Sequence, residues 1–132
     1  MALFLRTAPD AGVAYTLGNI YGDDKKVTPE RIKLVGDMMR QPGNGEAFIQ
    51  SIEEFSLPDP DPLLKSITAP TLILWGAEDA VMPIEHGRRM AAAIPNAKLE
   101  VYEGVGHVAQ EESPDETIID VKAFLASIEA GY

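Results

Sequence analysis

An aspartate and a histidine each follow a segment of this sequence that has the pattern of a β-strand. Asp79 stands in the loop after residues 71–76, and His107 stands in the loop after residues 98–102. In an open α/β sheet, ligands bind at the loops that follow the carboxyl ends of the strands. A buried carboxylate that holds a histidine fixes its tautomer and stabilises the imidazolium, which makes the histidine the base of a nucleophilic triad. The two residues therefore indicate acid–base chemistry directed at a nucleophile.

The sequence between these two residues predicts the elements that would position them. Residues 71–75 are apolar at successive positions, as in a strand that helices cover on both faces. Residues 84–94 predict a helix, and residues 98–102 alternate between charged and apolar side chains, which indicates a half-solvated edge strand. Two strands joined through one helix are parallel, so both loops are expected at the same edge of the sheet. The inward face of the helix is predicted to hold Ile84, Gly87, Ala91 and Ile94.

A last helix is predicted to begin at Pro114. The run Ser113-Pro114-Asp115-Glu116 has the pattern of a capping box, with proline at the first helical position. Its spacing of apolar residues predicts a buried face on one side of the helix. That face is predicted to hold Ile118, Val121, Leu125 and Ile128.

The sequence before residue 57 is predicted to be helical. A short helix is expected at 14–21 after a turn at 9–12, a second helix starts at the Thr28-Pro29 cap, and a third covers 46–55. The glycine-rich run 41–45 ends the second helix. The residues predicted to be buried are Ile32, Val35, Met38, Met39, Phe48, Ile49, Ile52 and Phe55. We interpret them as core, and the alternative is that they line a substrate cavity, because such cavities have apolar walls.

Alternating prolines mark the clearest boundary in the chain. Residues 57–62 predict an extended connector, because proline continues neither a helix nor a central strand, and a short helical turn is expected at 63–67. The connector separates the helical part of the chain from the α/β part. The predicted organisation is a helical segment, 1–66, and an α/β segment, 67–132.

The composition excludes several classes of function. The chain has 132 residues and a net charge of −10, from 21 acidic and 11 basic residues, which argues against nucleic acid and anionic membrane as partners. There is no cysteine, so a disulfide, a thiolate metal site and a cysteine nucleophile are excluded, and a reducing cytoplasm is the expected location. No apolar run approaches the length of a membrane span. With two histidines, no metal site and no cofactor are expected.

Three runs of the sequence resemble the C-terminal part of α/β-hydrolase fold enzymes. They are Ala69-Pro-Thr-Leu-Ile-Leu-Trp-Gly-Ala-Glu-Asp79-Ala-Val-Met-Pro83, Ala93-Ile-Pro-Asn-Ala and Gly104-Val-Gly-His107-Val-Ala-Gln-Glu-Glu-Ser-Pro114. The resemblance covers about residues 67–125 and leans toward the esterase, haloperoxidase-like and carbon–carbon-bond hydrolase branches. It implies a C-terminal fragment of this α/β fold: a helical lid at 1–66, a two-stranded parallel β-α-β unit and a C-terminal helix. It further implies that Asp79 is the orienting acid and that His107 is the general base which deprotonates a serine.

Other charged residues near these two are given lesser roles. Glu78 is a neighbouring acid that could be confused with Asp79, and His86 is interpreted as structural or exposed. Glu111 and Glu112 are interpreted as surface groups or as groups that pin the loop of the histidine. Gly104 and Gly106 are expected to let the backbone turn sharply before His107.

The sequence departs from the resemblance at the nucleophile. No Gly-x-Ser-x-Gly elbow occurs among its residues, and no histidine- and glycine-rich oxyanion-hole segment is present. The nearest mimic is centred on Thr16, with no strand before it, and is rejected. A base and its orienting acid have nothing to activate without a nucleophile, so the chain is predicted to be a partial ester or carbon–carbon-bond hydrolase that is inactive alone.

The second hypothesis is a non-catalytic scaffold derived from a hydrolase. A two-stranded sheet is marginal alone, and residues 71–75 would leave an unpaired apolar edge. We therefore expect self-association, through this edge or through exchange of the helical lid. A small-molecule substrate is expected as a partner only if an N-terminal half completes the site.

Overall fold

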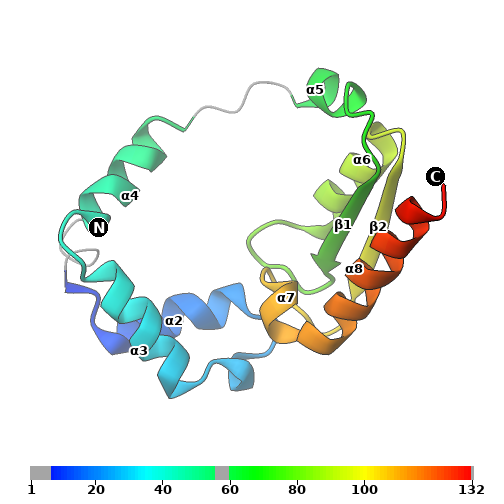
Figure 1. The fold of residues 1–132 in the computed structure, drawn as a ribbon. Coiled ribbons are helices and arrows are strands. Elements are labelled where there is room, and N and C mark those ends of the chain that lie inside the picture. Colours follow the sequence, from blue (N-terminus) through cyan, green and yellow to red (C-terminus); the bar gives the residue numbers. More distant parts are fainter. Residues whose placement is uncertain (1–6, 56–59, 132) are drawn as a thin grey trace. The chain divides into compact units, whose positions relative to one another are not determined.

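The computed structural model describes residues 7–55 and 60–131, and it contains a two-stranded sheet with helices before, between and after the strands (Figure 1). The first part of the chain forms α2 (Asp10–Ile20), the 3₁₀ turn η1 (Asp24–Lys26), α3 (Pro29–Met39) and α4 (Asn44–Glu53). The second part forms α5 (Asp61–Lys65), β1 (Thr71–Gly76), α6 (Ile84–Ala93), β2 (Ala97–Tyr102), α7 (Ala109–Glu112) and α8 (Pro114–Glu129).

The chain divides into two compact units. One consists of residues 1–19 and 24–58, and the other of residues 20–23 and 59–132. The segment Ile20–Asp23 therefore packs with the α/β part of the chain, although the residues on both sides of it belong to the helical unit. The role of the helical unit as a lid stays a prediction.

The predicted β-α-β unit is confirmed. Strands β1 and β2 pair in parallel, with Thr71 opposite Ala97 at one end and Gly76 opposite Tyr102 at the other. The predicted inward face of α6 is also confirmed, because its four residues are all buried or half-buried. The carboxyl ends of both strands therefore lie at the same edge of the sheet, where Asp79 and His107 follow them.

A small core fixes the end of β2 against the last helix. Tyr102, Val105 and Ala109 are buried together, with Leu74 of β1 packed against them. The hydroxyl of Tyr102 donates a hydrogen bond to Asp120 of α8 at 2.7 Å. Burial raises the pKa of the Tyr102 hydroxyl, and the neighbouring Asp120 carboxylate raises it further. Tyr102 is therefore a neutral donor that ties β2 to α8.

Helix α8 begins where the sequence predicts, but its cap and its buried face differ from the prediction. Ser113 precedes Pro114 as expected, yet its side chain makes no capping bond, and its φ of −135° and ψ of 61° differ from the extended backbone usual at an N-cap. The same residue ends α7, where its N–H donates to the carbonyl of Ala109 at 2.9 Å. Ile118 and Leu125 are 46% and 53% exposed, so their predicted burial is wrong. The residues that are buried or half-buried on this helix are Thr117, Asp120, Val121, Phe124 and Ile128.

In the first unit, too, the sequence predicts the positions of the helices better than the burial of their side chains. The Thr28 cap is confirmed, since its hydroxyl oxygen accepts the N–H of Arg31 at 3.2 Å. Helix α4 begins at Asn44, two residues before its predicted start, because Gly43 turns the chain with a φ of +88°. The predicted burial is wrong at four positions, where the exposed fractions lie between 53% and 71%. These positions are Met38, Phe48, Ile52 and Phe55.

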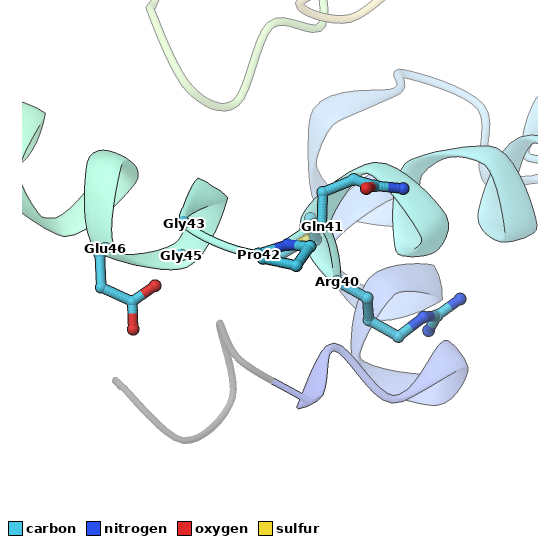
Figure 2. A pocket seen from close by; sticks show the side chains of 7 residues that line it. Arg40, Gln41, Pro42, Gly43, Gly45 and Glu46 are labelled. Carbon is cyan, nitrogen blue, oxygen red and sulfur yellow. The ribbon is translucent and has the colours of Figure 1, made fainter.

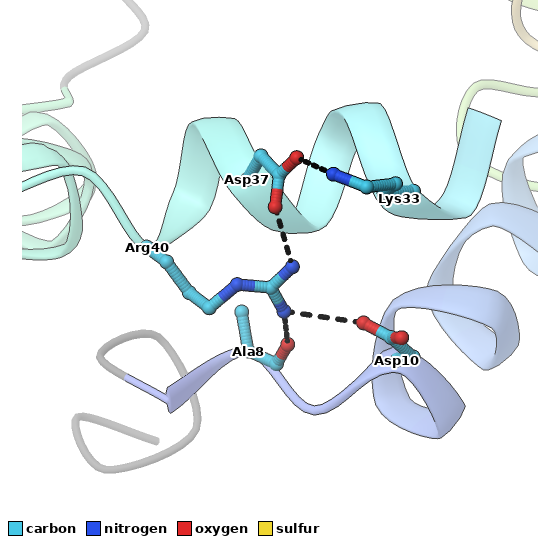
Figure 3. A network of polar contacts seen from close by, with 5 residues as sticks. All are labelled: Ala8, Asp10, Lys33, Asp37 and Arg40. Atoms are coloured by element: carbon cyan, nitrogen blue, oxygen red, sulfur yellow. Dashed lines mark hydrogen bonds and ion pairs between the residues drawn. The ribbon is translucent and has the colours of Figure 1, made fainter. Parts of the chain in front are cut away.

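Arg40 ties the start of the first unit to α3 (Figure 3). One guanidinium nitrogen donates to the carbonyl of Ala8 at 2.6 Å and to Asp10 at 3.2 Å, and the other donates to Asp37 at 3.0 Å. The hydrogen bond from Lys33, followed by that from Arg40, lowers the pKa of the Asp37 carboxyl. Charged pairs on a surface contribute little individually, but this fork holds three chain positions at once.

Two other boundaries differ from the sequence prediction. The residues predicted as a turn at 9–12 form the first turn of α2, because the carbonyl of Pro9 accepts the N–H groups of Gly12 and Val13. The helical turn predicted at 63–67 is α5, which begins at Asp61. Residues 57–59 of the predicted connector lie outside the described residues.

Candidate active site

The structure brings Asp79 and His107 into contact. His107 Nδ1 lies 2.8 Å from Asp79 Oδ2. The two residues are 28 positions apart in the sequence, and they meet because parallel β1 and β2 end at the same edge of the sheet. The predicted acid and base therefore form a hydrogen-bonded pair within the second unit.

Asp79 is buried and held from both sides. Its side chain is 4% exposed. Its Oδ1 atom accepts the N–H groups of Val81 and Met82, at 2.9 and 2.8 Å, while Oδ2 faces His107. Burial alone would raise the pKa of this carboxyl, but the Met82 N–H, the His107 ring and the Val81 N–H together hold the pKa below its ordinary value. Asp79 is therefore an ionised acceptor near neutral pH.

His107 presents its second ring nitrogen away from this pair. An ionised carboxylate can only accept, so Nδ1 carries the proton and Nε2 carries the lone pair. Within the part of the chain that the structure describes, Nε2 has no hydrogen-bond partner, and the side chain is 40% exposed. The ring is therefore oriented as a base toward an open side.

The backbone around His107 is held by close contacts between glycines. A Cβ atom on Gly76 would overlap the carbonyl oxygens of Val105 and Gly106, and one on Gly106 would overlap the backbone of residues 20–22. Gly104 has a φ of +69°, so the predicted sharp turn is confirmed there. Gly106 does not have a positive φ, and the close approach is what excludes a side chain at this position.

Further hydrogen bonds fix the same loop. The N–H of His107 donates to the carbonyl of Ile20 at 2.7 Å, and the N–H of Glu78 donates to the carbonyl of Val105 at 2.9 Å. Glu112 accepts from the N–H groups of Gly106 and Gly22, so the interpretation of this residue as a group that pins the loop is confirmed. His86 is exposed, as interpreted.

Sequence reasoning missed the contribution of the segment Ile20–Asp23 and the short helix α7. No strand or motif signal marks residues 20–23, and a helix of four residues is too short for a periodic pattern. The one usable signal was the pair of acids close after His107, of which Glu112 is buried and Glu111 accepts the hydroxyl of Tyr21 at 2.6 Å.

Within residues 20–23 and 60–131, no hydroxyl group forms a hydrogen bond with the His107 ring. The hydroxyls of Ser51, Ser66 and Ser127 donate to backbone carbonyls three residues earlier. Thr16, the rejected mimic, donates to the carbonyl of Gly12 at 3.0 Å. Among residues 7–55 and 60–131 there is also no cluster of acidic or histidine side chains that could hold a metal ion.

One surface depression of the described residues lies away from this pair in the sequence. It has a volume of about 460 Å³ and is formed by the turn between α3 and α4 (Figure 2). Its lining consists of Met39, Arg40, Gln41, Pro42, Gly43, Gly45 and Glu46. It contains neither the acid nor the base, so we do not assign catalysis to it. None of the described helices has the length and hydropathy that crossing a membrane requires.

The sequence matches known proteins over most of its length. A family model described as the alpha/beta hydrolase fold matches residues 19–114. A 2-hydroxy-6-oxononadienedioate/2-hydroxy-6-oxononatrienedioate hydrolase of Klebsiella pneumoniae is 36% identical over 94 residues, which cover 70% of this chain and 33% of that protein. A 2-hydroxy-6-oxo-6-phenylhexa-2,4-dienoate hydrolase of Burkholderia cepacia is 37% identical over 96 residues, which cover 70% and 34%. The chain spans about a third of the length of these relatives.

Solved structures agree with the sequence matches. A meta-cleavage product hydrolase from Pseudomonas fluorescens superposes with a TM-score of 0.78 and 26% identity, over 96% of this chain and 50% of that chain. A bromoperoxidase from Bacillus anthracis superposes with a TM-score of 0.73 over 94% of this chain and 46% of that chain, and at 24% identity this likeness shows the fold alone. The described fold therefore corresponds to about half of each of these structures.

Proposed function

Because this chain belongs to the alpha/beta hydrolase fold family, we propose that it supplies the acid and the base of a Ser-His-Asp triad. Asp79 is the orienting acid and His107 is the general base. The observation that carries the proposal is the 2.8 Å contact between His107 Nδ1 and a buried, ionised Asp79, which leaves Nε2 as the atom that can take a proton. Acid–base chemistry of this kind needs no cofactor or metal.

The proposed reaction is hydrolysis of a carbon–carbon bond next to a carbonyl group, or of an ester. The relatives named 2-hydroxy-6-oxo-dienoate hydrolases support this class of substrate. His107 would take the proton of a serine hydroxyl or of a water molecule, and the Asp79 carboxylate would stabilise the imidazolium that forms. The proton would return from Nε2 to the leaving group. The lack of cysteine in the sequence supports a cytoplasmic location.

We propose that these 132 residues do not complete the reaction alone. The sequence has no Gly-x-Ser-x-Gly elbow, and the hydroxyls of Ser51, Ser66 and Ser127 donate to backbone carbonyls of their own helices. A serine nucleophile and the donors of an oxyanion hole would come from a segment that carries the first half of the fold. A fluorophosphonate probe, which labels activated serines, is therefore expected to leave the purified chain unmodified in an intact-mass measurement.

Complementation tests the proposed function. The purified chain is mixed with the N-terminal half of a related meta-cleavage product hydrolase that carries the nucleophile elbow, and hydrolysis of p-nitrophenyl butyrate and of a 2-hydroxy-6-oxo-dienoate is followed. We expect activity only in the mixture, and we expect His107→Ala to remove it, because no other group can take the serine proton. The control is His86→Ala, which changes the other, exposed histidine and should leave the activity intact. Labelling of the chain alone, or equal activity with His107→Ala, would contradict the proposal.

A scaffold that associates with itself is the second candidate function. Several of the large apolar side chains that the fold leaves more than 45% exposed favour it, among them two on α4 and three on α8. Large apolar side chains exposed on one helix face are candidate interaction sites. The residues concerned are Phe48 and Ile52 on α4 and, separately, Ile118, Ile119 and Leu125 on α8.

Light scattering tests this second candidate. At micromolar concentration we expect the chain to be a dimer or larger, because burying these side chains removes apolar surface from water. Replacing Ile119 and Leu125 by serine is expected to shift the population toward the monomer, while the matched double change of exposed polar residues, Glu116→Ser and Lys122→Ser, should leave it unchanged. A monodisperse wild-type monomer would exclude the scaffold.

A further inference from the structure

Glu112 is a buried acid whose two carboxylate oxygens hold two different backbone amides. The residue is 6% exposed. Its Oε1 atom accepts the N–H of Gly106 at 2.8 Å, and its Oε2 atom accepts the N–H of Gly22 at 2.9 Å. Buried carboxylates normally have such partners, but here the partners belong to two segments more than 80 residues apart in the sequence.

The two amides lie at a junction directly beside the base. Gly106 immediately precedes His107, whose own N–H donates to the carbonyl of Ile20, two residues before Gly22. The two glycine backbones also touch, since a Cβ atom on Gly22 would lie 2.6 Å from the nitrogen of Gly106. The segment Ile20–Asp23 and the loop of His107 are therefore fastened together, and the Glu112 carboxylate bridges the junction.

An ionised carboxylate is suited to this bridge. It offers two acceptor oxygens and no donor, whereas the amide of glutamine offers one acceptor and one donor group. Glutamine at this position would satisfy only one of the two N–H groups and would place its own NH₂ against the other. A buried N–H without a partner costs free energy, so one of the two segments would move.

We propose that Glu112 is a positioning residue for His107. It holds the Gly106 peptide, and through it the His107 backbone, at the place from which the imidazole reaches Asp79. The hydrogen bonds of Glu112 are observed whatever the function of the chain is, but a role in catalysis rests on the proposed function. The neighbouring Glu111 is a natural comparison, because it is also acidic and lies in the same helix, yet its described bond goes to the hydroxyl of Tyr21.

The test uses nuclear magnetic resonance on the purified chain, where the strongly deshielded Nδ1 proton of His107 reports the bond to Asp79. The chain has two histidines, so His86→Gln identifies the signal. In Glu112→Gln we expect this signal to disappear, and we expect hydrogen exchange of at least one of the Gly106 and Gly22 amides to accelerate by about tenfold or more, because glutamine can accept only one of the two N–H groups. In Glu111→Gln the signal and the exchange rates should remain as in the wild type. All spectra are recorded well below the unfolding midpoint of each variant, which separates positioning from a loss of global stability.

The outcomes are distinguishable. A folded Glu112→Gln chain that keeps the Nδ1 proton signal and the slow exchange would overturn the proposal. If that variant does not fold, the same amides are measured in the wild type. Exchange of the Gly106 and Gly22 amides as fast as in an unstructured peptide would also overturn the proposal. Slow exchange, with scalar coupling from each amide to the Glu112 carboxylate carbon, would support the proposal. The measurement needs no turnover, so a failure of the complementation experiment does not affect it.

Discussion

Replacing Asp79 by asparagine in the complemented enzyme is expected to lower kcat by about 10⁴-fold, which is the size of effect that loss of the orienting carboxylate has in a serine triad. Asparagine has nearly the same shape as aspartate, so the loop should keep its fold. The amide oxygen can still accept the N–H groups of Val81 and Met82, which bind Oδ1 in the structure. The side-chain NH₂ would then point at His107 Nδ1.

The consequence for His107 is a change of tautomer. An NH₂ group donates, so Nδ1 must become the acceptor and the ring proton must move to Nε2. The nitrogen that faces the open side would then carry a proton and could not take one from a serine. The readout is kcat for both substrates, together with the loss of the deshielded Nδ1 proton signal in the chain alone.

The control for Asp79→Asn is Glu78→Gln. Glu78 is adjacent in sequence and exposed, and among the described residues its carboxylate accepts the N–H of Gly104, at 3.2 Å. Glutamine can accept the same bond, so kcat should change by no more than about twofold, as surface substitutions cause little change. A larger loss in Glu78→Gln than in Asp79→Asn would mean that the orienting acid is wrongly assigned.

Replacing Gly76 by alanine is expected to reduce the free energy of unfolding by about 3 kcal/mol, at the upper end of the range for overpacked sites. The added methyl group would overlap the carbonyl oxygens of Val105 and Gly106. These atoms are backbone and cannot rotate away as a side chain would, so β1 and the loop of His107 must separate. Urea unfolding measures the stability, and the Nδ1 proton signal of His107 should weaken as well.

Gly18→Ala is the matched control for this prediction. A Cβ atom at Gly18 would have Asp24 Cβ at 4.0 Å as its nearest neighbour, which is ordinary contact. Gly18 lies within α2, where alanine is favoured over glycine by about 1 kcal/mol. The variant should be as stable as the wild type or more stable. Equal stability of Gly76→Ala and the wild type would mean that the two segments do not approach closely.

The sequence predicted the strand–helix–strand unit because its signals are local. Residues 71–75 are continuously apolar, the helix has a regular period, and the loops of Asp79 and His107 follow the strands directly. Parallel pairing then places both loops at one edge, as the structure shows. The parallel topology of the two strands, more than the type of either residue, therefore brings Asp79 and His107 into contact.

Burial on α4 and α8 was predicted less well, for a physical reason. Periodicity identifies which side chains share a helix face, but burial depends on whether another element covers that face. Ile52 of α4 and Leu125 of α8 are 54% and 53% exposed, although both are predicted to be buried. The described fold corresponds to about half of the solved meta-cleavage product hydrolase. The described elements therefore do not cover all of the apolar helix faces that periodicity predicts to be buried.

The sequence suggests Glu112 as a group that pins the loop of His107, but it does not suggest the bridge to Gly22, because the two partner amides are far apart in the sequence and amides leave no mark in it. The glycines before His107 predict a sharp turn of the backbone, and the positive φ of Gly104 provides it. Gly106 and Gly22 serve instead for close approach between backbones. Such pairs can be found only when the two segments are placed in space.

The route of the chain through residues 20–23 bears on how this protein can be dissected. The second compact unit is discontinuous, because its first four residues are separated from the rest by the stretch 24–58. An expression fragment that begins after Pro58 would lack the carbonyl of Ile20 and the amide of Gly22, and would leave Glu112 and the His107 amide without these partners. A shortened protein that contains the acid–base pair must therefore also contain Ile20–Asp23 beside α7. A circular permutation or a covalent graft of this segment would provide it.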